Sequence, residues 1–242
     1  MKGRNVTVRA VMFDFGATLI LDDRFDYFAS LRKAHEVLEI GGVAPSFEEF
    51  KRVYLRVRSD LWNDGELREH TYGYRLSKVL ELLGYDVPES DRRIVEATKV
   101  FTRTLVDSLY MEDYVPGLLE RLHRRYKLAV VSNLGIPEVV HITLEKFDLK
   151  KHFDYLLASG TVGYRKPSPV IFNAALKALQ TQPAETVFVG DSFYHDVQGA
   201  RAMGMKTIWL RRKPNQTNEV SNVIPDRTID DLRELPSAIE NM

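Results

Sequence analysis

Six polar side chains of this 242-residue chain are of types that bind metal ions and phosphate, and they stand beside predicted strands or helices. They are Asp14, Ser132, Asn133, Lys166, Asp191 and Asp196. Carboxylate oxygens are the hard ligands that Mg²⁺ prefers, with waters and a phosphate oxygen completing its shell. A carboxylate that attacks a phosphate must overcome like-charge repulsion, which a metal ion and a lysine neutralise. These residue types favour phosphoryl transfer, with Asp14 as a covalent nucleophile that forms an aspartyl-phosphate.

Short apolar runs alternate with helical stretches through most of the chain. The predicted strands are 8–13, 128–131, 153–157, 186–189 and 206–210, and the predicted helices are 117–125, 137–147, 169–180, 197–203 and 229–239. This alternation predicts an α/β fold, a Rossmann-like parallel sheet with helices on both faces. Ligands bind beyond the carboxyl ends of such strands, where the polar residues stand. Ser168-Pro169 is typical of a helix start, and 214–222 reads as a loop.

Residues 22–113 interrupt the alternation. Four helical stretches fill this region, over 26–40, 46–62, 70–83 and 90–110, and no strand is predicted there. Ser46 followed by Glu49 fits a capping box at the start of the second stretch. We therefore predict an inserted all-helical cap domain, 22–113, in a core domain made of 1–21 and 114–242.

Composition excludes several classes of protein. Lysine plus arginine and aspartate plus glutamate both number 34, so no net field attracts the chain to nucleic acid or an anionic membrane. The basic clusters 121–125 and 211–213 are interpreted as solvated charge. Cysteine is absent, which excludes disulfides, cysteine-bound metals and thiol nucleophiles. With no signal peptide and no apolar run of membrane length, we expect a soluble, cytoplasmic protein without nucleic-acid or membrane partners.

Four motifs resemble those of the haloacid dehalogenase superfamily of aspartate-nucleophile hydrolases, in the branch with a helical cap. They begin at Phe13-Asp14-Phe15-Gly16-Ala17-Thr18-Leu19, Val130-Val131-Ser132-Asn133, Arg165-Lys166-Pro167-Ser168-Pro169 and Val189-Gly190-Asp191-Ser192, the last continuing through Asp196. The resemblance spans nearly the whole core. It implies that Asp14 is the nucleophile, that Ser132 and Asn133 hold the phosphate, and that Lys166 balances charge. It also implies a Mg²⁺ cofactor held by Asp14, the Gly16 carbonyl, Asp191 and Asp196, and a cap that closes over the substrate.

Gly16 departs from the pattern. Most phosphatases of the family carry an aspartate at this position, which protonates the leaving group and later activates water. Such general acid–base catalysis contributes typically 10²–10⁴-fold. Replacement acids to be considered are Asp22, Asp23, His35 and His195, although His195 is interpreted first as a solvated loop residue.

Three activities and one non-enzymatic alternative stay open. The metal-site aspartates favour a Mg²⁺-dependent phosphatase of a small phosphorylated metabolite, acting as a monomer or homodimer. A 2-haloacid dehalogenase also lacks the acid, but such enzymes dispense with metal and carry tyrosine at the Gly16 position. A phosphonate hydrolase has a small residue there and a Schiff-base lysine in its cap, whereas Lys33, Lys51, Lys78 and Lys99 stand in no recognisable motif. The last alternative is a binding protein on the same scaffold.

Overall fold

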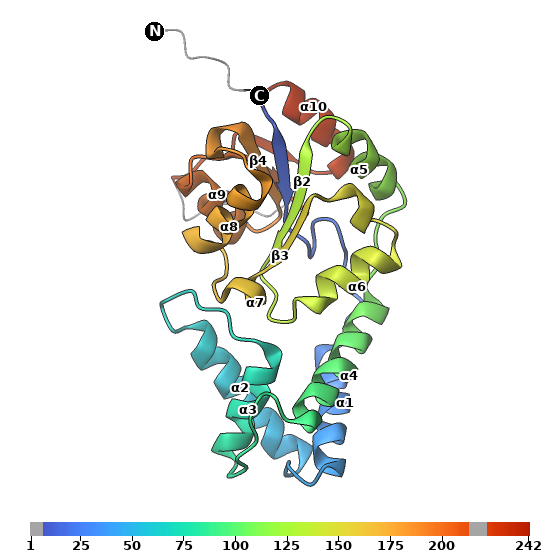
Figure 1. Cartoon of the computed structure of the whole chain (residues 1–242), viewed down its shortest axis with the longest axis vertical. Helices are drawn as coiled ribbons and strands as arrows, with labels where there is room; N and C mark the ends of the chain where they lie inside the picture. Colours follow the sequence, from blue (N-terminus) through green and yellow to red (C-terminus); the bar gives the residue numbers. More distant parts are fainter. Residues whose placement is uncertain (1–6, 213–221) are drawn as a thin grey trace.

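A parallel six-stranded β-sheet forms the centre of the α/β part of the molecule (Figure 1). The computed structural model describes residues 7–212 and 222–242. The strands lie in the order β3-β2-β1-β4-β5-β6, and every neighbouring pair is parallel. Their bounds are β1 Ala10–Phe13, β2 Lys127–Ser132, β3 Tyr155–Ala158, β4 Thr186–Gly190, β5 Lys206–Leu210 and β6 Arg227–Ile229. The predicted α/β fold is confirmed.

Helices cover both faces of the sheet. Side chains alternate along a strand, so Val11 and Phe13 of β1 face one side while Ala10 and Met12 face the other, and all four are fully buried. The first pair packs with α5, α6 and α10, and the second pair with α8 and α9. The helices of this part are α5 Val115–His123, α6 Glu138–Lys146, α7 Ser159–Val162, α8 Pro169–Leu179, α9 Gly199–Ala202 and α10 Leu235–Glu240.

The register of the central strands brings their carboxyl ends level. Phe13, the last residue of β1, pairs with Val130 of β2 and with Val189 of β4. The loop that starts at Asp14 therefore leaves the sheet between the ends of two neighbouring strands. Segments more than 100 residues apart in the sequence meet at one edge, as parallel strands require.

The chain end differs from its prediction. The helix predicted over 229–239 was wrong at its start, because residues 227–229 form the edge strand β6 and α10 begins only at Leu235. A 3₁₀ turn, Leu232–Glu234, separates the two. Two of the three β6 residues are exposed, so no apolar run signals the strand. The predicted loop 214–222 lies outside the described residues except for residue 222.

Four long helices separate β1 from α5 and form a block at one end of the molecule, away from the sheet (Figure 1). They are α1 Tyr27–Ile40, α2 Phe47–Trp62, α3 Tyr72–Leu82 and α4 Arg92–Ser108. Leu31, Phe50, Leu76 and Phe101, one from each helix, are buried in a shared apolar cluster. We call this block the cap; its predicted limits at residues 22 and 113 stay a prediction.

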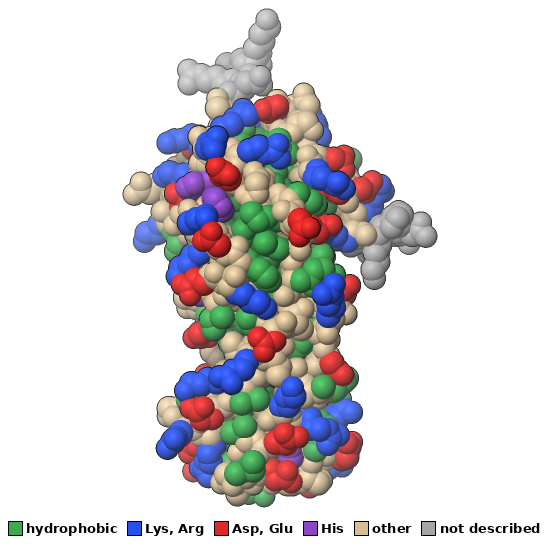
Figure 2. Space-filling model, turned by 90° about the vertical axis from the view of Figure 1, so that its right-hand side faces the viewer, with side chains coloured by type: hydrophobic (Ala, Val, Ile, Leu, Met, Phe, Trp, Pro, Cys, Tyr) green, Lys and Arg blue, Asp and Glu red, His purple; other side chains and the backbone are tan. Residues whose placement is uncertain are grey.

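The surface carries both signs of charge. Figure 2 shows lysine and arginine intermingled with aspartate and glutamate over one face of the molecule, so this face presents no large patch of a single sign. Among the helices described here, none is long and apolar enough to cross a membrane.

Two predicted helix starts had different outcomes. Ser168 caps α8 as predicted, because its Oγ accepts a hydrogen bond of 3.3 Å from the Val170 N–H and Pro169 is the first helical residue. The capping box at Ser46 was wrong: its side chain makes no capping hydrogen bond. Glu49, the expected partner, lies 3.9 Å from the Arg52 guanidinium instead.

We therefore expect Ser168→Ala to lower the free energy of unfolding by about 1 kcal/mol, the usual cost of losing an N-cap. The matched control is Ser46→Ala, which removes a helix-start serine without a capping bond and should change stability by less than about 0.5 kcal/mol. Urea denaturation of both variants measures the difference. Equal losses would contradict the assignment of the cap.

Candidate active site

Asp14 is the first residue beyond β1. Its N–H donates to the Val189 carbonyl at 2.9 Å, which extends the sheet by one bond, and the chain then turns back on itself. Ala17 adopts a left-handed conformation with φ of 54° in this turn. Arg212 donates to the carbonyls of Ala17 and Thr18 at 2.7 and 2.6 Å. The interpretation of this arginine as solvated charge was wrong, since it holds the loop that carries Asp14.

Lys166 is buried between two carboxylates. Its Nζ lies 2.6 Å from Asp14 Oδ1 and 2.7 Å from Asp196 Oδ1, and the side chain is 1% exposed. Burial disfavours the charged ammonium, but the two carboxylates outweigh burial and raise the pKa of Lys166. The structure thus brings together three predicted site residues from three separate segments of the chain.

Asp191 completes an acidic cluster with Asp14 and Asp196. One oxygen of each carboxylate lies within 4.8 Å of the others. The Thr18 hydroxyl, in the turn after Asp14, is 3.4 Å from both Asp14 Oδ2 and Asp191 Oδ1. Burial and the Asp14 charge raise the pKa of Asp191 to about 6, and burial raises the pKa of Asp196 as well. Three carboxylates facing one ammonium leave surplus negative charge, which suits a divalent cation with oxygen ligands.

Gly190 makes room for this cluster. A Cβ added there would lie 2.3 Å from Asp196 Oδ2, so any larger residue would displace the carboxylate. The same oxygen accepts a 2.9 Å hydrogen bond from the Ser192 N–H. The glycine of the Gly190-Asp191-Ser192 sequence at the end of β4 is therefore required for packing against Asp196.

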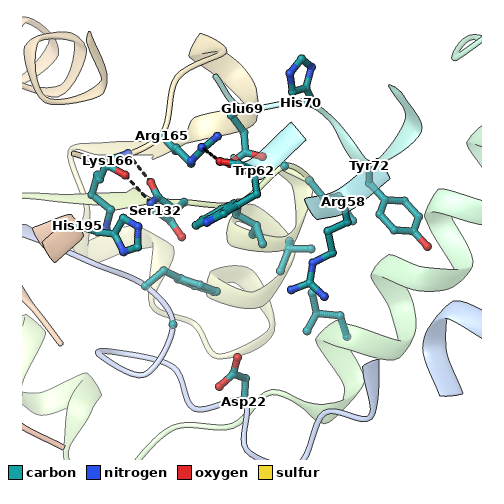
Figure 3. Close-up of a pocket in the computed structure, with 18 of the residues that line it drawn as sticks. Asp22, Arg58, Trp62, Glu69, His70, Tyr72, Ser132, Arg165, Lys166 and His195 are labelled. Carbon is teal, nitrogen blue, oxygen red and sulfur yellow. Dashed lines mark hydrogen bonds between the residues drawn. The ribbon is translucent and has the colours of Figure 1, made fainter. Parts of the chain in front are cut away.

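Asn133 is tied to the backbone of Lys166 rather than facing the cavity freely. Its Nδ2 donates to the Lys166 carbonyl at 3.0 Å, and its Oδ1 accepts from the Lys166 N–H at 2.7 Å. Both ends of the side-chain amide are used, so this residue fixes the loop of Lys166. Ser132 lies beside Lys166 in the wall of the cavity (Figure 3).

Gly16 lies in the cavity wall next to open space. A Cβ added at Gly16 would have no heavy atom within 4 Å, and its backbone is not in the left-handed region. No steric demand explains the glycine, since no atom of the described residues beyond its chain neighbours comes within 4 Å of that Cβ position.

A cavity of about 790 Å³ lies between the acidic cluster and the cap. Figure 3 shows cap side chains on one side of it, and they include Arg58, Trp62, Glu69, His70 and Tyr72. Glu69 pairs with Arg75 at 3.1 Å, whereas Arg58 stacks over the Tyr27 ring at 4.7 Å. Within the described part of the chain, Arg58 has no carboxylate within 4.0 Å. The cap therefore presents an uncompensated cation to the cavity.

The proposed replacement acids divide into two groups. Asp22 and His195 line the cavity, and burial raises the pKa of Asp22 but lowers that of His195. His195 Nδ1 is 2.9 Å from Ser192 Oγ, so its interpretation as a solvated loop residue was wrong. His35 is buried in the cap with Nε2 2.7 Å from the Pro45 carbonyl, and neither it nor Asp23 is among the described lining residues.

Several residues of the site escaped prediction. They are Thr18, Arg58, Glu69, Arg75, Arg165 and Arg212. Thr18 and Arg165 lie inside two of the four sequence motifs, and this position could have identified them as site residues. The cap residues have no motif, because their place in the cavity depends on how the cap docks.

Comparison with known proteins supports the motif assignment. The sequence profile of a family described as haloacid dehalogenase-like hydrolase matches residues 8–204. A phosphoserine phosphatase of Thermus thermophilus is 34% identical over 171 residues, which cover 71% of this chain but only 64% of that protein. A glyceraldehyde 3-phosphate phosphatase of Pyrococcus abyssi is 26% identical over 97% of this chain and 94% of its own length.

Solved structures support the fold. A 2-haloacid dehalogenase from Pseudomonas syringae pv. Tomato aligns with a TM-score of 0.76 at 23% identity, over 97% of this chain and 99% of its own. A haloacid dehalogenase-type phosphatase from Thermococcus onnurineus aligns with a TM-score of 0.66 at 23% identity, over 95% and 97%. At 23% identity, these two structures are evidence for the fold alone. Together with the match of the family profile over most of the chain, they show that this protein is a hydrolase of the haloacid dehalogenase-like family.

Proposed function

We propose that this hydrolase is a Mg²⁺-dependent phosphatase of a small phosphorylated metabolite, with Asp14 as the nucleophile. The observation that carries the proposal is the cluster of three carboxylates around one buried lysine. A dehalogenase that works without metal has no use for the surplus negative charge, whereas a metal-assisted phosphatase does. The phosphatase relatives and the uncompensated Arg58 cation support the same conclusion.

Each residue of the proposed site has its own role in this mechanism. An Asp14 oxygen attacks phosphorus, and a P–O bond to Asp14 forms as the ester P–O bond breaks. Lys166 holds Asp14 and balances the charge of the incoming phosphate, while the Ser132 hydroxyl binds a phosphate oxygen. Bound Mg²⁺, held by Asp14, the Gly16 carbonyl and Asp191 with support from Asp196, would offset the repulsion between carboxylate and phosphate. Water then cleaves the aspartyl-phosphate and releases inorganic phosphate.

The mechanism lacks a dedicated acid to protonate the leaving group. Gly16 offers no acid, so the leaving alcoholate takes its proton from another group or from water; of the candidates named from the sequence, Asp22 and His195 line the cavity. Substrates whose leaving groups are stable as anions should therefore react fastest.

The alternatives have less support. A phosphonate hydrolase needs a cap lysine at the substrate, but among the described residues that line the cavity, none is a lysine of the cap. A pure binding protein has no need to maintain a buried lysine between two carboxylates, an arrangement with a large desolvation cost.

Asp14→Asn gives the first test. We expect the wild-type protein to hydrolyse p-nitrophenyl phosphate only with Mg²⁺, and the variant to lose at least about 1,000-fold in kcat/KM because the nucleophile is gone. Released nitrophenolate is measured with Mg²⁺ and with EDTA. Halide release from 2-chloropropionate without metal is the parallel assay for a dehalogenase. Equal inactivity of both proteins across a panel of phosphate esters would refute the phosphatase proposal.

Gly16→Asp tests the missing acid. A Cβ at this position meets nothing within 4 Å, so the backbone accepts a side chain there. We expect kcat to rise at least about tenfold for an alkyl phosphate, which needs protonation, and less for p-nitrophenyl phosphate. The isosteric control Gly16→Asn cannot donate the proton and should give no gain. An equal gain from asparagine would show that proton transfer is not the limiting step.

Asp191→Asn tests, by stability measurements alone, whether the acidic cluster carries surplus negative charge. The pKa of Asp191 is raised from its usual 3.8 to about 6, so the folded protein holds this proton more tightly than the unfolded chain. In EDTA, the stabilisation is present below pH 4 and is lost as pH rises to about 6, a loss of up to about 3 kcal/mol. The asparagine variant should be spared that loss in urea denaturation at pH 7.5, and Mg²⁺ should stabilise the wild-type protein more than the variant. The exposed Asp60→Asn serves as the control; identical pH profiles for Asp191→Asn and wild type would contradict the prediction.

A further inference from the structure

Arg165, the residue before Lys166, is a buried arginine whose guanidinium binds polar groups of the cap. The residue is 3% exposed. Nη2 donates to the Trp62 carbonyl and Nη1 to the Arg68 carbonyl, and Nη2 lies 3.8 Å from Asp64 Oδ1. Figure 3 shows the bond to Trp62 reaching across from the loop of Lys166. All these partners belong to residues 62–69, the last residue of α2 and the loop that follows it, which we call the cap segment.

The backbone of the same loop also binds the cap segment. The Arg165 N–H donates to the Leu67 carbonyl at 2.9 Å, and the Glu69 N–H donates to the Gly163 carbonyl at 2.9 Å. Arg68 and Tyr164 form an antiparallel bridge between these two bonds. The core loop and the cap segment are thus joined by two backbone bonds and by one side chain.

Trp62 links this contact to the cavity. Its ring centroid is 4.3 Å from the Arg165 guanidinium carbon and 5.9 Å from the ring centroid of His195. His195 belongs to the π-helical segment η3, Phe193–Gln198, which also carries Asp196. The indole therefore lies between the loop of Lys166 and the segment of Asp196, in the wall of the cavity.

We propose that Arg165 is a positioning residue, through which docking of the cap segment fixes Lys166 against Asp14. Arg165 and Lys166 share a peptide unit, so a shift of one backbone moves the other. A buried guanidinium without its two carbonyl acceptors is strongly disfavoured, so undocking of the cap segment moves the Arg165 loop. The planar guanidinium binds two carbonyls while stacking on an indole, which a lysine ammonium cannot do. Lys166 is thereby coupled to the docking of the cap segment.

The test compares Arg165→Met and Arg165→Lys with the control Glu66→Gln. Glu66 lies in the cap segment and is exposed, but it pairs with the Arg68 side chain and does not line the cavity. Hydrogen–deuterium exchange is followed at the amides of Glu69 and Arg165, and Trp62 supplies a fluorescence signal. We expect at least tenfold faster exchange at both amides and red-shifted emission in Arg165→Met, a smaller change in Arg165→Lys, and none in the control.

Kinetics supply a second readout, and only this part rests on the proposed phosphatase function. With Mg²⁺ and p-nitrophenyl phosphate, Arg165→Met should lower kcat at least tenfold while KM changes less than threefold, because Lys166 is misplaced rather than lost. Unchanged exchange at both amides in a folded Arg165→Met protein would overturn the proposal, and so would uniformly faster exchange throughout the chain, which indicates a general loss of stability. If Arg165→Met does not fold, Arg165→Lys is judged by the same criteria. A protein without phosphatase activity that still shows the local exchange change would refute the proposed function alone.

Discussion

The ion pairs of Lys166 with Asp14 and Asp196 are the constraint on which the rest of the site depends. An ammonium that is 1% exposed persists as an ion only with carboxylates at hydrogen-bond distance, here 2.6 and 2.7 Å. The surrounding structure holds each member in place. Asn133 fixes the backbone of Lys166, the absent side chain of Gly190 leaves room for Asp196, and Arg212 holds the turn after Asp14. These supports hold the charged groups at ion-pair distance, which is why residues without a chemical role matter to the chemistry.

The sheet makes such a cluster possible because parallel strands end at a common edge. Phe13, Val130 and Val189 lie in register on three adjacent strands, so the loops that follow them meet although they are far apart in the chain. This topology gathers the acids in the loops just beyond the strand ends. The result is a site with surplus negative charge on the core side and cationic side chains, including Arg58, on the cap side. Core acids and cap cations therefore face each other across one cavity.

The sequence could predict the core of the site because its residues stand at fixed offsets from strand ends. Asp14, Asp191 and Asp196 were found in this way and Lys166 from its loop just before a helix, and the structure brings the four together. What was missed depends on contacts across long separations. Arg212 binds Ala17 across 195 residues, and Arg165 binds Trp62 across 103, so neither contact leaves a local pattern. β6 was missed for a different reason: a three-residue edge strand with two exposed residues has no apolar periodicity.

Gly16 shows that two tasks of an aspartate-based hydrolase can be separated. Charge balance needs the buried network around Lys166, and that network is complete here. Leaving-group protonation needs one further carboxyl group, and the space beside Gly16 is open rather than occupied by a substitute. Loss of a general acid costs 10²–10⁴-fold, far less than the loss of a nucleophile, so a scaffold without it remains an enzyme. The missing acid therefore bears on leaving-group protonation and leaves the charge network intact, and the cap, which contacts the loop of Lys166 through Arg165, forms the opposite wall of the same cavity.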